Sequence, residues 1–185
     1  MRRYNDMKLV LAESLRELLV DRQLEDITVK LIVENCGTTT RTFYNHFKDK
    51  QDLAYWMYSK ELLSLVVYHE EAVVDWVATF CSMLNHMYTD KSLYGKLVVY
   101  NGQNSFMDAM YEEAVLTYLA DISSKLEPSD DLDDLRFVVE CFLKGNSTQL
   151  REWLLGGCKI TPQEFVQKSA LCFPEILKPF FYFDE

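Results

Sequence analysis

Hydrophobic positions along the chain repeat with the spacing of amphipathic helices. The first predicted helix fades near residues 22–23 and carries an apolar stripe at i, i+4, i+7 and i+8, formed by Leu11, Leu15, Leu18 and Leu19. Strand-like alternation is hard to find, and no proline occurs in the first 127 positions. The pattern therefore predicts an all-α fold.

Polar residues and one glycine mark the ends of the next, shorter helices. Thr28 suits the N-cap of a helix that runs to Cys36. Gly37 suits its C-terminal end, because glycine adopts the left-handed conformation without a steric penalty. Thr39 then suits the N-cap of a third helix, at about residues 39–47.

The rest of the chain is predicted to form longer helices. Asp49 suits the N-cap of a helix over residues 50–68. Further helices are expected near 72–89, 91–101, 105–126, 130–155 and 162–178. This organisation predicts a three-helix, helix-turn-helix head in residues 1–50 and a helical body in residues 51–185, joined through the 50–68 helix.

The last predicted helix has the clearest start signal in the body. Thr161 and Glu164 have the spacing of a capping box, and Pro162 stands at the first helical position.

The charge distribution separates the head from the body. The net charge is −10, which is unusual for a protein that binds nucleic acid. Residues 1–52 hold nine Lys/Arg and nine Asp/Glu, whereas residues 53–185 hold ten and twenty. Residues 37–50 carry a local charge of +2. An acidic body with a locally basic head is compatible with a sequence-specific DNA-binding protein.

Several classes of protein are disfavoured by the sequence. No apolar run of about 18 residues is present, and the N-terminus does not resemble a signal peptide, so we expect a cytoplasmic protein that does not enter a membrane. Five widely spaced cysteines and three histidines form no CxxC or HxxxH pair, which indicates free thiols and no metal site. We find no catalytic nucleophile, paired carboxylates or cofactor motif, so we do not expect an enzyme or a cofactor.

Residue types suited to reading DNA are concentrated between positions 37 and 50. With Thr39 at the cap, Phe43 and Phe47 share one stripe that faces the core of the head. Arginine can bridge O6 and N7 of guanine, and hydroxyl groups suit phosphates or base edges. The candidate DNA-binding residues are Thr28, Thr38, Thr39, Thr40, Arg41, Thr42, Tyr44, Asn45, Lys48 and Lys50. An ordinary helical hairpin with a solvated charged face is the alternative.

The same segment resembles the reading helix of the TetR family of transcriptional regulators. The resemblance rests on Gly37, Thr39, Thr42, Phe43, Tyr44, His46, Phe47, Asp49, Lys50 and Leu53. It implies a homodimer that binds a palindromic operator in double-stranded DNA under the control of an unknown small-molecule effector. Residues 151–164 loosely resemble the subfamily of dihydroxyacetone kinase operon activators. The alternative function is a helical protein-interaction module whose head no longer binds DNA.

The resemblance implies a dimer, and the apolar 130–155 helix suits one. With the 162–178 helix it could form half of an intermolecular four-helix bundle. The expected interface residues are Val139, Phe142, Leu143, Gly145, Leu150, Trp153, Leu154 and Phe165. A purely intramolecular core is the alternative.

The middle helices carry the aromatic and methionine residues expected of an effector pocket. The candidate pocket residues are Phe80, Met83, Met87, Tyr94, Phe106 and Met110. Stripes of this kind also occur in ordinary cores, so this alternative stays open.

Overall fold

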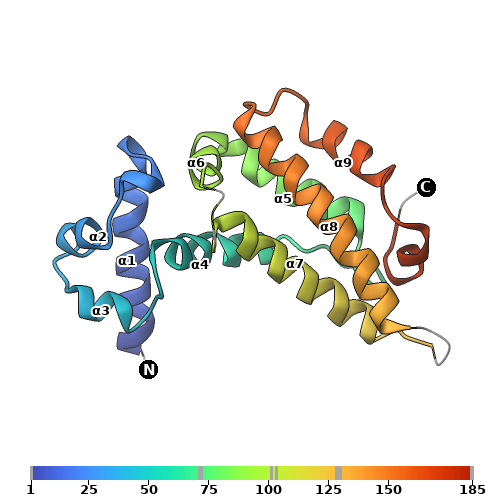
Figure 1. Ribbon diagram of the computed structural model, residues 1–185, viewed down its shortest axis with the longest axis horizontal. Helices are drawn as coiled ribbons and strands as arrows, with labels where there is room; N and C mark the ends of the chain where they lie inside the picture. The colour runs from blue at the N-terminus through green and yellow to red at the C-terminus, as the bar shows by residue number, and fades with distance from the viewer. Residues whose placement is uncertain (1, 71–72, 101, 103, 128–130, 184–185) are drawn as a thin grey trace.

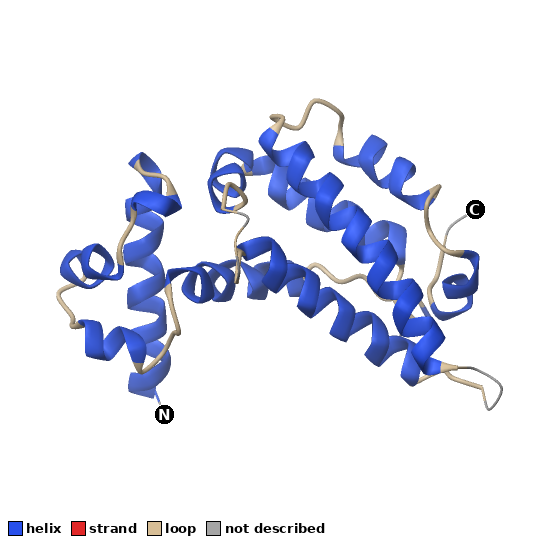
Figure 2. Ribbon diagram, viewed as in Figure 1, coloured by secondary structure: helices blue, strands red, loops and turns tan. Residues whose placement is uncertain are grey.

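Helices form the architecture of the computed structural model, which describes residues 2–70, 73–100, 102, 104–127 and 131–183 (Figure 2). The elements in chain order are α1 (Arg2–Asp21), the 3-10 helix η1 (Leu24–Asp26), α2 (Val29–Asn35), α3 (Thr40–Tyr44), α4 (Lys50–Leu63), α5 (Trp76–Thr89), α6 (Lys91–Leu97), α7 (Phe106–Ser123), α8 (Leu132–Leu155), α9 (Pro162–Ala170) and the 3-10 helix η3 (Glu175–Phe180). The all-α prediction is confirmed.

The three N-terminal helices pack together at one end of the molecule (Figure 1). Leu11 and Leu15 of α1 are fully buried, as are Ile32 of α2 and Phe43 of α3. The hydroxyl of Ser14 also donates to the Ile32 carbonyl at 2.7 Å, which joins α1 to α2. These contacts give the head a small core of its own.

The predicted helix caps are present in the head. Thr28 accepts a hydrogen bond from the Leu31 amide at 3.2 Å, and Thr39 accepts one from the Thr42 amide at 3.1 Å. Gly37 has a φ of 68° and ends the turn after α2, as expected for a glycine C-terminal cap.

The body is a layered arrangement of α4 to α9 (Figure 1). α8 packs along α7, α5 packs against α9, and α4 packs against both α7 and α1. α4 therefore runs from the head into the body and belongs to the cores of both.

Several predicted helices differ in extent from the observed ones. The helix expected over 91–101 ends at Leu97, and the one expected over 72–89 begins at Trp76. The helix expected over 50–68 ends at Leu63, because the following segment turns back and Tyr68 forms an isolated β-bridge with Val74. The helix expected over 162–178 is divided into α9 and η3, since Pro174 lacks the amide that would continue it. Residues 72, 101 and 130, which belong to other predicted helices, lie outside the described residues.

The residues predicted at a dimer interface are mostly buried within their own chain. Gly145 is exposed, and no atom comes within 4 Å of a Cβ built on it. α8 contacts α7, α6 and η3 within the chain, and most of its large apolar side chains are buried. The prediction is therefore corrected for seven residues that belong to the core: Val139, Phe142, Leu143, Leu150, Trp153, Leu154 and Phe165.

Candidate nucleic-acid interface

α3 is held on the head by two buried phenylalanines. Phe43 has no exposed surface, and the ring centroid of Phe47 lies 5.6 Å from that of Trp56 in α4. Regular helix ends at Tyr44, but the Phe47 amide still donates to the Phe43 carbonyl at 3.0 Å. The helical turn thus continues to the end of the predicted segment.

The opposite side of α3 is open to solvent. Tyr44 is 60% exposed, and its ring meets that of Phe43 edge-on at 5.4 Å, which directs the phenol away from the core. Thr38 and Thr42 are half-buried. The candidate residues that lie exposed are Thr28, Thr39, Thr40, Arg41, Tyr44, Asn45 and Lys48.

The hydroxyls of Thr39 and Thr42 take part in the helix cap and can each form further hydrogen bonds. The two oxygens lie 3.0 Å apart, and Thr39 also caps the helix. Because a hydroxyl has one donor and two acceptor sites, this pair can still bond to a phosphate or a base edge.

The turn between α3 and α4 is fixed by two aspartates. Asp49 accepts hydrogen bonds from the amides of Gln51 at 2.8 Å and Asp52 at 2.9 Å, which confirms it as the N-cap of α4. Asp52 in turn accepts one from the Lys48 amide at 2.9 Å. The exposed side chain of Lys48 therefore starts from an ordered backbone position.

Lys50 has a different role from the predicted one. Its Nζ donates to the carbonyls of Leu24 at 2.6 Å, Glu25 at 2.9 Å and Ile27 at 2.7 Å. Burial lowers its pKa, and the charges of Glu25, Asp26 and Asp49 oppose that effect. An ammonium group has three donors, so none is left for a phosphate. The prediction of a DNA contact is corrected: Lys50 ties the start of α4 to η1.

Lys8 is a basic residue beside this surface that the sequence reading missed. Its Nζ lies 5.1 Å from the ring centroid of Phe47 and 5.4 Å from that of Trp56. The pKa of His46 is lowered, first by burial and then by the charge of Lys8. The helical stripe of α1 gave no indication that Lys8 would meet the end of the α3 segment.

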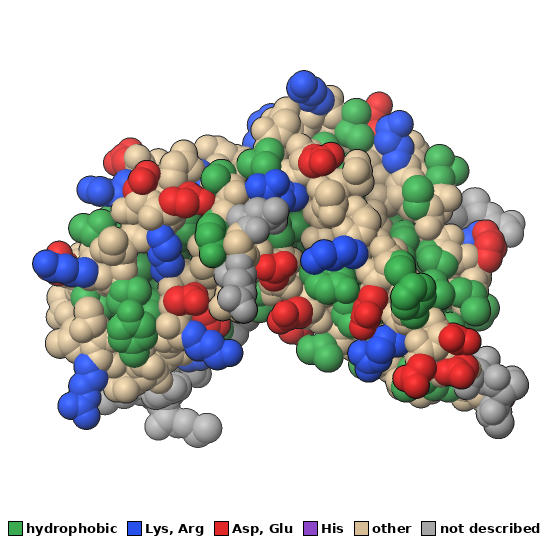
Figure 3. Space-filling model, in the orientation of Figure 1, with side chains coloured by type: hydrophobic (Ala, Val, Ile, Leu, Met, Phe, Trp, Pro, Cys, Tyr) green, Lys and Arg blue, Asp and Glu red, His purple; other side chains and the backbone are tan. Residues whose placement is uncertain are grey.

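Charge is unevenly distributed over the face drawn in Figure 3. Lysine and arginine side chains project from the outer edge of the head, while acidic side chains gather over the junction of α7 and α8. This agrees with the separation of an acidic body from a neutral head in the sequence.

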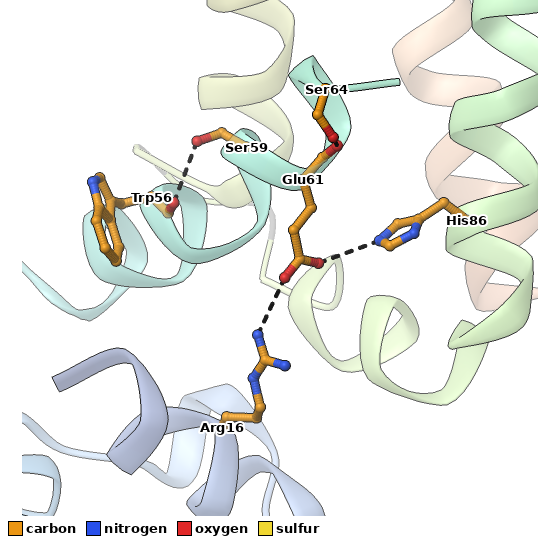
Figure 4. A network of polar contacts seen from close by, with 6 residues as sticks. All are labelled: Arg16, Trp56, Ser59, Glu61, Ser64 and His86. Carbon is orange, nitrogen blue, oxygen red and sulfur yellow. Dashed lines mark hydrogen bonds and ion pairs between the residues drawn. The ribbon is translucent and has the colours of Figure 1, made fainter. Parts of the chain in front are cut away.

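A network of polar contacts joins the head to the body through α4 (Figure 4). Glu61 of α4 lies 3.3 Å from Nη2 of Arg16 in α1 and 3.4 Å from Nε2 of His86 in α5. All three side chains are partly exposed, so the network contributes little to stability. Glu61 thus contacts one side chain of the head and one side chain of the body.

A second candidate site is a cavity of about 190 Å³ in the body. α4, α5, α7 and α8 supply most of its walls. Of the predicted pocket residues, Phe80, Met83 and Met110 line it. The sequence did not identify several others, including Tyr55, Glu113, Tyr118 and Asp121.

The other three predicted pocket residues belong to the core. The ring of Tyr94 packs 5.4 Å from Tyr58 and 6.4 Å from Phe106. Met87 is also buried and away from the cavity lining. Tyr94 and Phe106 both pack against Tyr58 of α4, and a sequence stripe cannot show that contact.

The described residues show neither a membrane-spanning helix nor a metal site. No described helix combines the length and hydropathy of a membrane span. No described group of three or more His, Cys, Asp or Glu residues is placed to hold a metal ion.

Comparisons with known proteins agree with a DNA-binding transcriptional regulator. The family model "Bacterial regulatory proteins, tetR family" matches residues 12–54. The model "Transcriptional regulator C-terminal region" matches residues 74–171, more than half of the chain. The chain belongs to the TetR family of transcriptional regulators, and it is not an enzyme.

Curated relatives have the same class of function. The HTH-type transcriptional regulators SAUSA300_2515, from Staphylococcus aureus strain USA300, and SAOUHSC_02897, from strain NCTC 8325 / PS 47, are each 25% identical to this chain over 145 residues. Each match covers 75% of this chain and 76% of the relative.

A solved structure shares the fold. The dihydroxyacetone kinase operon activator DhaS superposes with a TM-score of 0.59, covering 95% of this chain and 98% of that chain. At 15% sequence identity the likeness concerns the fold alone.

Proposed function

We propose that this regulator binds a palindromic operator as a homodimer, with the surface around α3 of each chain in one major groove. The proposal rests mainly on the 38–48 segment, which has one buried apolar side and one exposed side. Its buried side is formed by Phe43 and Phe47, and its exposed side carries Arg41 and Tyr44. A short helix presented in this way suits base and phosphate contacts.

The proposed contact set follows the exposure of the side chains. Lys50 is removed because its donors are occupied, and Lys8 is added because it lies beside Phe47. The set is Lys8, Thr28, Thr38, Thr39, Thr40, Arg41, Thr42, Tyr44, Asn45 and Lys48. We assign DNA binding to residues 1–50, and binding of the effector and of the second chain to residues 51–185.

The dimer interface is proposed on the exposed face of α8 and the end of α9. Phe137 is 70% exposed and Leu155 is 45% exposed at the two ends of α8, and Leu171 after α9 is 88% exposed. Cys141 and Gly145 follow Phe137 at intervals of four residues and are also exposed. Large exposed apolar side chains on neighbouring helices are typical of a surface that a partner covers. Two heads joined this way need a spacing of about 34–36 Å to reach successive major grooves.

Effector control is proposed to act through α4. Tyr55, Ser59 and Leu62 of this helix line the cavity, while Lys50 at its start is bonded to η1 of the head. A ligand in the cavity would bias the position of α4 and so change the spacing of the two heads. A regulator of this kind acts in the cytoplasm.

Selection of duplex DNA from a random pool by the full-length protein tests the proposal. Enrichment of a palindrome with half-sites about 10 base pairs apart, or a multiple of that spacing, supports it. No enrichment at low salt would instead favour the helical interaction module whose head does not bind DNA.

A further inference from the structure

Two carboxylates line a cavity that is otherwise apolar and aromatic. Glu113 and Asp121, both from α7, are half-buried and contribute to its wall. Neither carboxylate has a lysine, arginine or histidine partner within ion-pair distance among the described residues. The aromatic part of the wall is formed by Tyr55, Trp76, Phe80, Tyr111, Tyr118 and Phe181.

No basic side chain belongs to the described lining of the cavity. Two lysines lie nearby, and both are engaged elsewhere. Lys125 donates to the Phe180 carbonyl at 2.8 Å. Lys144 lies 3.9 Å from Asp108 and 4.5 Å from the ring centroid of Tyr111.

The negative charge of Glu113 acts on a neighbouring tyrosine of the lining, and the pKa of Asp121 is itself raised. Burial raises the pKa of Tyr55 to about 12, and the charges of Glu113 and Glu112 act in the same direction. Burial also raises the pKa of Asp121 more than the charge of Lys125 lowers it. The ionised carboxylates would therefore be stabilised by a positive charge inside the cavity.

Apart from the two carboxylates, the polar groups of the described lining are neutral. The hydroxyls of three lining residues donate to backbone carbonyls: Thr117 to Glu113 at 2.9 Å, Thr79 to Val67 at 3.2 Å, and Ser59 to Trp56 at 3.5 Å. An anion would lose its hydration here and meet two carboxylates but no described positive charge.

We propose that the cavity binds a compact organic cation, with an apolar or aromatic body and one quaternary or protonated amino group. Carboxylates and the faces of aromatic rings both attract such a group, and the attraction strengthens where water is excluded. The inference rests on the proposed effector role of the cavity and adds the chemical class of its ligand.

Three probes of nearly equal shape separate charge from size. Phenyltrimethylammonium is a cation, tert-butylbenzene is its neutral analogue, and benzenesulfonate is an anion of similar form. In calorimetric titrations of the full-length protein we expect the cation to bind about tenfold more tightly than the neutral analogue. The anion should bind more weakly than either.

Substitution of the carboxylates should affect the cation selectively. Glu113→Gln and Asp121→Asn should each weaken its binding about three- to tenfold, with tert-butylbenzene unchanged. Glu152→Gln is the matched control, because Glu152 is exposed on α8 and does not line the cavity. Equal losses for the charged and neutral probes would show that the carboxylates only shape the cavity, and would contradict the proposal.

The comparison of the three probes uses the unaltered protein, so it tests the proposal even if a variant folds poorly. If the neutral or anionic probe binds as tightly as the cation, the charge class is wrong and the cavity remains a ligand site. If none of the three binds, the effector role of the cavity is overturned as well. DNA binding, measured on the same preparation, tests the head independently of both outcomes.

Discussion

The Lys96 ammonium of α6 donates to the Leu19 carbonyl at 2.6 Å, and also to the Val20 carbonyl at 2.9 Å. A residue of the body thus binds the C-terminal end of α1 in the head. A positive charge at this end also interacts favourably with the helix dipole. A similar contact is found at the C-terminal end of α6. There, Arg151 of α8 donates to the carbonyls of Val98 and Val99, both at 2.9 Å. α6 therefore links α8 to α1.

This connection is separate from the one through Glu61. The contact between Lys96 and Leu19 involves α6 and the end of α1, whereas Glu61 joins α4 to Arg16 and His86. These two contacts hold the head against the body. A ligand that shifts α4 would have to distort or break both of them.

Lys96→Met should loosen the end of α1 without disturbing the core. The substitution keeps the apolar stem but removes the charged donor, so we expect a loss of about 1–2 kcal/mol in the free energy of unfolding. Hydrogen exchange should accelerate at the last turn of α1. Lys159→Met, at an exposed loop position, is the control. Unchanged exchange at that turn would show that the contact does not hold the helix.

Arg41→Ala should weaken operator binding by about 1–3 kcal/mol. The side chain is exposed on α3, so the thermal midpoint should stay the same. Fluorescence anisotropy titrations with the selected operator measure the change, with Arg22→Ala as the control for a lost surface charge. If both substitutions weaken DNA binding equally, Arg41 does not contact the bases of the operator.

Lys48 and Lys50 should respond in opposite ways to substitution. Lys48→Met should lower DNA affinity for all sequences and reduce the slope of log affinity against log salt by about 1, with the stability unchanged. Lys50→Met should lower the free energy of unfolding by about 2–3 kcal/mol, because three carbonyls lose a charged donor.

Chemical denaturation and salt titrations of DNA binding measure both effects. A stable Lys50→Met variant with a reduced salt slope would restore the phosphate contact that the sequence predicted.

Phe137→Glu should dissociate the proposed dimer. Placing a charge within the proposed apolar contact should cost more than about 2 kcal/mol per dimer. Sedimentation velocity at micromolar concentration would then detect a monomer, while Leu116→Glu, at an exposed site on α7, should leave the dimer intact. Monomers of the unaltered protein would contradict the interface itself.

Local signals were predictable from the sequence because they involve residues a few positions apart. The caps at Thr28, Thr39 and Asp49 and the capping box of Thr161 with Glu164 are all present. Each depends on a side chain and an amide within the same turn.

Features that depend on distant partners could not be predicted in the same way. Lys50 looked like a phosphate contact because nothing nearby in sequence reveals three carbonyls located 23–26 residues earlier. The apolar residues of α8 looked suited to a partner because the sequence does not show which of their sides α7 and α6 cover. Phe80 lines the cavity and Met87 does not, although both lie on α5.

The central claim, that α3 reads base edges in the major groove, is tested most directly by atomic substitution in the selected operator. Replacing each purine in turn by its 7-deaza analogue removes the N7 acceptor that faces this groove. We predict losses of affinity at a symmetric pair of positions, one in each half-site, and no further loss there for Arg41→Ala. Insensitivity of the unaltered protein at every purine would contradict the claim.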